Sequence, residues 1–335
     1  MINLYKLHSK PKTLFGYARM MKVPRIAWEM TNNEQKAKLK SLWLQDPWYA
    51  YRYALLTKKP WPEAEPVIAQ DSYASSDYAH IVLQDRFPAG EAAIARDPEL
   101  ATLYARYILR KRWPEVEAMI AQDPRQAYLY AENVIRKPWP QGEPAILRDA
   151  SWSYYYAKNV LKKRWPRAEK LIASDPTYAT WYAYTVVNGP WPPGEAAIAT
   201  HPLLSLHYAN LVIKGPWPPG EAAIASRPQE AFLYAHEVIN GRWPPGEAAI
   251  AKHSQLAYEY ARQVLRKPWP AGEAAIAKDA SDSHNYAYSV IKGPWPPGEA
   301  AIAQDKVVSI SYAKNVLKDP DPTTWAERYR AKHGL

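Results

Sequence analysis

Glutamate recurs every 26 residues in this chain of 335 residues, in ten copies that run from Glu65 to Glu299. Two carboxylates can serve as general acid and general base, but such a pair lies about 5–10 Å apart and faces one substrate. Successive helical repeats place equivalent side chains roughly 10 Å apart along the array, which does not suit such a pair. We therefore expect each glutamate to bond first-turn amides, the tyrosine hydroxyl or the tryptophan indole of the next repeat. We predict no catalytic residue.

Tryptophan followed by proline opens the same interval, at Trp61 and then from Trp113 to Trp295, with Phe87 in the one remaining place. Exposed indole rings can stack on nucleic-acid bases. Rings pair only when their centroids lie within about 7 Å, so rings on successive repeats cannot form a continuous stack by themselves. We therefore expect the tryptophans to pack across the turn between helices.

Basic residues cluster at the ends of several repeats, next to the tryptophans. Cations interleaved with aromatic rings can follow a phosphate backbone. Cations also suit the C-terminus of a helix, so a purely structural role stays open. The candidate residues for binding anions or nucleic acid are Arg110, Lys111, Arg112, Arg136, Lys137, Lys162, Lys163 and Arg164.

Aromatic side chains also occur at positions that vary between repeats. Tyr155, Trp181, Tyr184 and His207 lie on the predicted outward stripe of the longer helix. Exposed aromatic residues are frequent anchors of protein interfaces. We therefore predict a protein-contact surface at these four residues.

Several classes of site find no support in the sequence. The chain has no cysteine, which excludes disulfides and thiolate metal sites. The histidines lack metal-ligand spacing, and no phosphate-binding glycine loop or nucleophile triad is present. We predict no metal, no cofactor and no small-molecule substrate. The net charge of +10 favours an anionic partner.

The 26-residue interval itself predicts the elements that must position these residues. Proline after tryptophan, then glutamate, begins a short helix, and Asp-Pro begins a longer one. A small residue, tyrosine, alanine and a β-branched residue share one face of the longer helix. Glycine then ends the longer helix in a left-handed conformation. The glycines in this place are Gly189, Gly215, Gly241 and Gly293.

These elements predict an all-α solenoid of about ten two-helix repeats with capped ends. We expect an irregular N-terminal segment over residues 1–30, and a cap helix with a degenerate repeat over 31–60. The ten repeats occupy 61–320, and a charged C-terminal cap helix occupies 321–335. Capping boxes are expected at Thr31 with Glu34 and at Thr324 with Glu327.

The repeat phrase resembles two groups of proteins. Its Ala-x-Asp-Pro and Pro-x-x-Glu punctuation resembles the design of the leucine-rich repeat variant family, with a different repeat length. The phrase Tyr-Ala-x-x-Val-Ile, then Trp-Pro-x-Gly-Glu-Ala-Ala-Ile-Ala, is more similar to uncharacterised tailed-bacteriophage repeat proteins. These proteins also open with a segment similar to Leu4 to His8. The resemblance implies a phage or prophage origin and supplies no activity.

We interpret the chain as a non-catalytic binding scaffold for a host or virion protein. Binding of RNA or single-stranded nucleic acid along a basic edge is the alternative. The polar first 14 residues do not match a signal peptide, and no run of 18 apolar residues occurs. We therefore expect no membrane segment and a place in the host cytoplasm or in the virion. The charged helices that cap both ends favour a monomer, or contact through the irregular first 30 residues.

Overall fold

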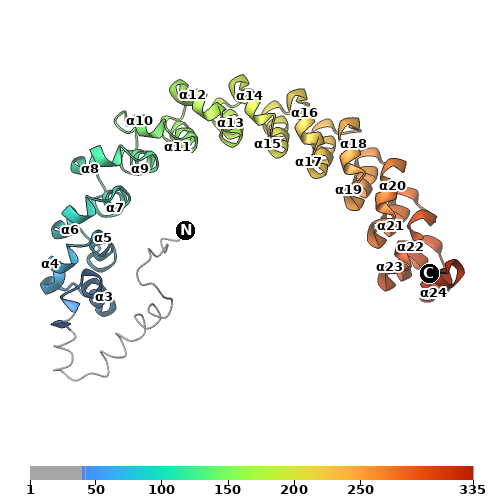
Figure 1. The fold of residues 1–335 in the computed structure, drawn as a ribbon, viewed down its shortest axis with the longest axis horizontal. Coiled ribbons are helices and arrows are strands. Elements are labelled where there is room, and N and C mark those ends of the chain that lie inside the picture. Colours follow the sequence, from blue (N-terminus) through green and yellow to red (C-terminus); the bar gives the residue numbers. More distant parts are fainter. Residues whose placement is uncertain (1–39, 42, 335) are drawn as a thin grey trace. The chain divides into compact units, whose positions relative to one another are not determined.

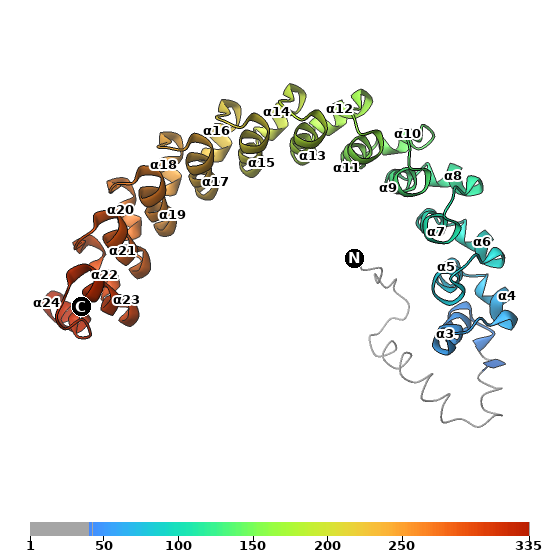
Figure 2. The same ribbon diagram turned by 180° about the vertical axis from the view of Figure 1, so that it is seen from behind.

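The computed structural model describes residues 40, 41 and 43–334. Every element in these residues is a helix, and no strand occurs among them (Figures 1 and 2). The predicted all-α fold of tandem helical repeats is therefore confirmed. Residues 1–30 and the capping box at Thr31 lie outside the described residues. No described helix combines the length and the apolar character that crossing a bilayer requires.

Each repeat contributes a short helix and a longer helix. The short helices are η1 (Pro62–Ala64) with α4 (Glu65–Ile68), α6 (Pro88–Ile94), α8 (Pro114–Ile120), α10 (Glu143–Ile146), α12 (Pro166–Ala173), α14 (Pro192–Ile198), α16 (Pro218–Ala225), α18 (Pro244–Ile250), α20 (Pro270–Ile276) and α22 (Pro296–Ile302). The α-helical parts of the longer helices are α5 (Ser72–Asp77), α7 (Pro98–Tyr104), α9 (Pro124–Tyr130), α11 (Ala150–Tyr155), α13 (Pro176–Tyr182), α15 (Pro202–His207), α17 (Pro228–Leu233), α19 (Ser254–Glu259), α21 (Ala280–Tyr286) and α23 (Lys306–Tyr312).

Each longer helix continues as a π-helix. These continuations are η2 (Tyr78–Leu83), η3 (Ala105–Leu109), η4 (Ala131–Ile135), η5 (Tyr156–Leu161), η6 (Ala183–Val187), η7 (Tyr208–Ile213), η8 (Tyr234–Ile239), η9 (Tyr260–Leu265), η10 (Ala287–Ile291) and η11 (Ala313–Leu317). The terminal helices are α3 (Pro47–Thr57) and α24 (Trp325–His333).

The helices divide into two compact units, one up to Trp152 and one from Ser153. Within each unit the helix pairs follow one another in regular order, with the short helices in one row and the longer helices in another (Figure 1). Within a unit, each pair therefore packs against its neighbours, as α14 does against α12 and α16 against α18.

The helix boundaries follow from local chemistry, as the repeat that begins at Trp165 shows. Trp165 has a non-helical backbone (φ −122°, ψ 84°) and Pro166 occupies the first helical position, where a missing N–H costs nothing. The carboxylate of Asp175 accepts hydrogen bonds from the amides of Thr177 and Tyr178, at 2.8 and 3.1 Å. Asp175 therefore caps the longer helix as the sequence predicts.

The core of the array is a column of tyrosines, isoleucines and small residues. Tyr130 and Ile198 are both 0 % exposed, as the solenoid interpretation requires. The column tyrosine of one repeat packs on the tryptophan that opens the next repeat; Tyr208 and Trp217, for example, lie 4.7 Å apart between ring centroids. These contacts bury large rings between neighbouring repeats, which is how a solenoid acquires a continuous core.

Each terminal helix supplies one ring of the same tyrosine–tryptophan contact. Tyr53 in α3 packs on Trp61 at 4.5 Å, and Trp325 in α24 packs on Tyr312 at 5.3 Å. The capping box predicted at Thr324 is wrong, because the Thr324 hydroxyl donates to the Asp321 carboxylate instead, at 2.6 Å. The ring contact joins α24 to the last repeat, together with the hydrogen bond from Arg330 Nη1 to the Ala303 carbonyl at 2.9 Å.

The π-helices were not predicted, and they change which residues face solvent. In η6 the Ala183 carbonyl accepts hydrogen bonds from the amides of Asn188 and Gly189. The wider turn leaves the β-branched residue of this segment, such as Val186, only half-buried. A continuous α-helix would have placed it on the buried face with the column tyrosine.

The left-handed residue at the end of each longer helix is not glycine. It lies one residue earlier than predicted, and the glycine that follows it has no positive φ. The prediction for Gly189, Gly215, Gly241 and Gly293 is therefore wrong. The residues with φ between 51° and 60° are Lys58, Gln84, Arg110, Arg136, Lys162, Asn188, Lys214, Asn240, Arg266, Lys292 and Lys318.

A change of these four glycines to alanine tests which residue of the turn has the left-handed conformation. A β-carbon at each of them would meet nothing within 4 Å. Alanine restricts the unfolded chain more than glycine does, so we expect each change to stabilise the fold by about 0.4–1 kcal/mol. Thermal unfolding of the fourfold variant, followed by circular dichroism, measures the effect. Alanine at Asn188 and Asn240 is the control and should lower the melting temperature; the opposite ranking would contradict the assigned turn.

Candidate binding surfaces

The recurring glutamates are structural hydrogen-bond acceptors. The column tyrosine hydroxyl donates to the glutamate of its own repeat at 2.8–3.1 Å, in nine repeats. The same hydroxyl accepts the backbone N–H of the residue that opens the repeat at 2.7–2.9 Å. The expected structural role therefore holds, with the tyrosine supplied by the same repeat.

Burial and charge keep this group inert. Burial raises the pKa of Tyr78, Tyr182 and Tyr260 to about 12, and the glutamate hydrogen bond adds to the rise. The column tyrosines are almost completely buried. A neutral phenol that already donates to a carboxylate has no proton to offer a substrate, so the group holds the turn together.

Arginines that end four of the repeats bind the glutamates. Arg112 donates from Nε and Nη2 to the two carboxylate oxygens of Glu117, at 2.8 and 2.6 Å. Arg164 binds Glu169 in the same way, at 2.7 and 2.8 Å. The arginine hydrogen bonds are the main cause of the lowered pKa of both glutamates. Such two-bond pairs fix the guanidinium in place.

This geometry alters the predicted anion-binding set. Arg112 and Arg164 already neutralise a carboxylate of the chain, so we remove them from the candidates. Lys111, Lys137 and Lys163 are exposed at the turns. Arg110, Arg136 and Lys162 occupy left-handed positions, and no ion pair involves these three in the described part of the chain.

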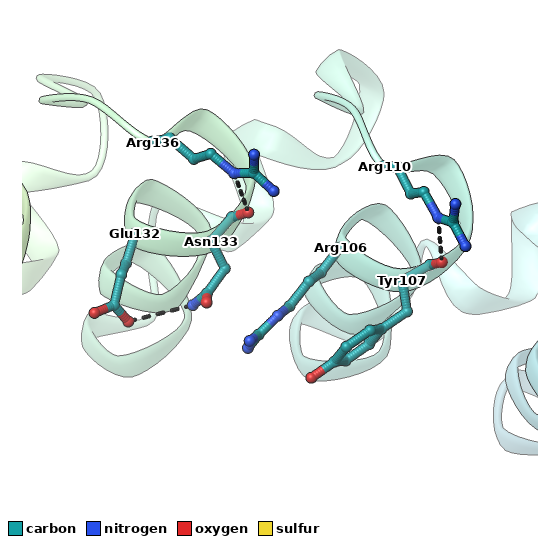
Figure 3. A pocket seen from close by; sticks show the side chains of 6 residues that line it. All are labelled: Arg106, Tyr107, Arg110, Glu132, Asn133 and Arg136. Carbon is teal, nitrogen blue, oxygen red and sulfur yellow. Dashed lines mark hydrogen bonds between the residues drawn. The ribbon is translucent and has the colours of Figure 1, made fainter.

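A cleft of about 400 Å³ lies between η3 and η4 in the first unit (Figure 3). Arg106, Tyr107 and Arg110 come from η3 and the residue that follows it, and Glu132, Asn133 and Arg136 are their counterparts at η4. The guanidinium of Arg106 stands over the Tyr107 ring, 4.8 Å from its centroid. In Figure 3 Arg106 extends into the space between the two turns.

Only part of this cleft was predicted. Arg110 and Arg136 belong to the predicted basic set, whereas Arg106, Tyr107 and Asn133 do not. An α-helical period does not place the residues equivalent to Tyr107 on the outward stripe. Their variation between repeats, as with Thr185 and Ser289, is the signal that could have identified an exposed position.

Three of the four predicted aromatic residues lie together in the second unit, and the fourth, Tyr155, lies one repeat before them. Trp181 lies 6.1 Å from Tyr184 and 6.3 Å from His207, between ring centroids. Tyr155 lies in the neighbouring repeat, 6.3 Å from Tyr178. Of the four, Tyr184 is exposed, at 41 %; the other three are half-buried rather than fully exposed as predicted. The predicted residues therefore form a partly exposed aromatic surface.

No group of acidic, histidine or cysteine residues in the described part of the chain could hold a metal ion. The described residues thus offer two candidate surfaces: the basic cleft of the first unit and the aromatic patch of the second.

A change of Tyr234 to phenylalanine tests the structural role of the column. It leaves the buried Trp217 N–H and the Glu221 carboxylate without the hydroxyl that joins them. We expect a loss of about 1–3 kcal/mol in local stability. Limited proteolysis and urea unfolding measure it. The control is Tyr288→Phe, at a tyrosine that is 59 % exposed, which should change neither; equal sensitivity of both variants would contradict the account.

Alkaline unfolding provides a second test. A tyrosine ionises near pH 10 in the unfolded chain, whereas the pKa of folded Tyr182 is about 12. The buried tyrosine therefore makes its full contribution to the free energy of unfolding below pH 10. This contribution is lost as pH rises from 10 toward 12, because in that range the unfolded chain releases the proton and the folded chain keeps it. We expect the absorbance of tyrosinate to rise together with the loss of helical ellipticity. Ionisation of all the tyrosines in a fully helical chain would contradict this.

No family model, curated protein or solved structure matches the chain. The phage resemblance therefore stays a prediction.

Proposed function

We propose that the chain is a non-catalytic scaffold that binds a protein partner through the aromatic patch of Tyr155, Trp181, Tyr184 and His207. The observation that supports this proposal most directly is the placement of three aromatic residues at one position of successive repeats. Tyr155, Trp181 and His207 are 26 residues apart, and other repeats have residues such as Leu233 and Ser311 there.

The patch rings also contact one another between repeats, as Trp181 does with His207 at 6.3 Å, but the repeats that lack these aromatic residues still stack. The column tyrosines and tryptophans already supply the ring contacts between neighbours, and they are buried. A ring that is half-buried by its own chain loses little conformational freedom when a partner covers the rest of it. Aromatic residues of this kind supply much of the binding energy at interfaces.

The proposed partner is a host or virion protein, in line with the phage resemblance. The proposal places the scaffold in the host cytoplasm or in the particle, and treats the chain as a monomer. It assigns the protein no reaction and no small-molecule substrate.

Alanine at Trp181 and at Tyr184 tests this surface. Loss of an anchor residue typically costs at least about 2 kcal/mol, so we expect roughly a thirtyfold weaker complex. Partners recovered by affinity capture from host lysate, with nuclease present, should be depleted by both variants. The remaining affinity of a purified partner is then measured by calorimetry.

The matched control is Tyr288→Ala, which removes a tyrosine at the place equivalent to Tyr184 in another repeat. It should leave binding intact, and circular dichroism should show all three variants folded. Capture that is unchanged by Trp181→Ala, or that disappears on nuclease treatment, would contradict the proposed surface.

A further inference from the structure

Cations occupy strained backbone positions along the array. Eight of the eleven left-handed residues are lysine or arginine, and the other three are Gln84, Asn188 and Asn240. A left-handed conformation costs a residue with a β-carbon about 1–2 kcal/mol, and asparagine and glycine tolerate it best. A cation at a helix C-terminus recovers about 0.3–1 kcal/mol from the dipole. Stability alone therefore does not favour lysine and arginine here over asparagine or glycine.

The chain has glycine where the backbone does not require it. Gly189, Gly215, Gly241 and Gly293 directly follow left-handed residues, have no positive φ and have open space around them. The strained place before each glycine is filled by asparagine or lysine instead. All eight left-handed cations are exposed, and none forms an ion pair within the described residues. Their charges are thus available to a ligand.

The cleft between η3 and η4 adds other groups to two of these cations. Arg110 and Arg136 hold their side chains by bonds from Nε to the carbonyls of Tyr107 and Asn133, at 3.4 Å each, so their terminal nitrogens are free of these bonds. Arg106 contributes a third guanidinium. The carboxylate of Glu132 accepts a bond from the Asn133 amide at 3.3 Å (Figure 3). The lining therefore has a net positive charge.

Tyr107 supplies a flat apolar face beside these cations. Its ring is 40 % exposed; the Arg106 guanidinium lies 4.8 Å from its centroid and the ring centroid of His80 lies 5.8 Å from it. Cations that bind phosphates next to a ring that can stack on a base are the elements of a single-strand binding surface. A duplex would leave the ring without an unpaired base.

We propose that this cleft binds single-stranded nucleic acid, with Arg106, Arg110 and Arg136 on the phosphates and Tyr107 stacked on a base. The site lies in the first unit and shares no residue with the aromatic patch of the second. Failure of either proposal therefore leaves the other intact.

Fluorescence anisotropy of the full chain with a labelled 20-residue oligothymidylate tests the site. The triple variant Arg106→Gln, Arg110→Gln, Arg136→Gln removes the guanidiniums; Gln84 shows that glutamine is accepted at the left-handed position. We expect at least tenfold weaker binding at moderate salt. The slope of log affinity against log salt should become shallower by about 0.7 for each phosphate that the variant no longer neutralises.

A control triple variant removes the same charge elsewhere. Arg96, Lys252 and Lys278 are exposed at the ends of short helices, and none forms an ion pair in the described part of the chain. Their change to glutamine should weaken binding less than twofold. Equal weakening by the two triple variants would show that overall charge, and not the cleft, attracts the strand, and would overturn the proposal.

Tyr107→Ser separates bases from phosphates, and Ser289 shows that serine is accepted at this place. Loss of one stacked base should weaken oligothymidylate binding about fivefold or more and leave binding of inorganic polyphosphate unchanged. An equal effect on both probes, or none, would overturn the base contact. Stronger binding of polyglutamate than of the oligonucleotide would identify an acidic protein as the ligand and would also overturn the proposal.

Discussion

One hydroxyl group joins the parts of a repeat, as nine of the described repeats show. The column tyrosine accepts the backbone N–H of the residue before the short helix and donates to a glutamate within that helix, as Tyr234 does with Trp217 and Glu221. Its ring then packs on Trp243, which opens the next repeat, at 4.7 Å between centroids. One side chain thus closes the turn within a repeat and supplies the contact between repeats. This double use explains why tyrosine is present in every copy.

The same interaction separates structural residues from those available for binding. The glutamates and the arginines that end four repeats bind each other at the turn and are not available to a ligand. The pair of Arg242 with Glu247 is an example. The left-handed cations Arg110 and Lys162, two residues before Arg112 and Arg164, remain exposed. Two basic residues in one short turn can therefore have different roles, and only hydrogen-bond geometry distinguishes them.

The sequence predicted the structural features that depend on helix caps and on the period of the repeat. The 26-residue interval, the Asp-Pro start at Asp175 and the burial of Tyr130 follow from rules that act within one or two turns. The π-helices could not be predicted in this way, because an α-helical period was assumed past the tyrosine. Under that assumption Tyr107 was not expected to be exposed, and the left-handed residue was expected one position too late, at the glycine. The engagement of Arg112 by Glu117 also depends on a turn geometry that spacing does not reveal.

Hydrogen exchange at the backbone amides of the tryptophans that open the repeats tests the central claim most directly. An amide directly before a helix has no intrahelical partner and normally exchanges fast. Here the tyrosine hydroxyl binds it, at 2.8 Å for Trp217. The account predicts that these amides exchange as slowly as those in the middle of the longer helices. Exchange as fast as that of the exposed first-turn amides would show that the hydroxyl does not hold the turn, and would contradict the account.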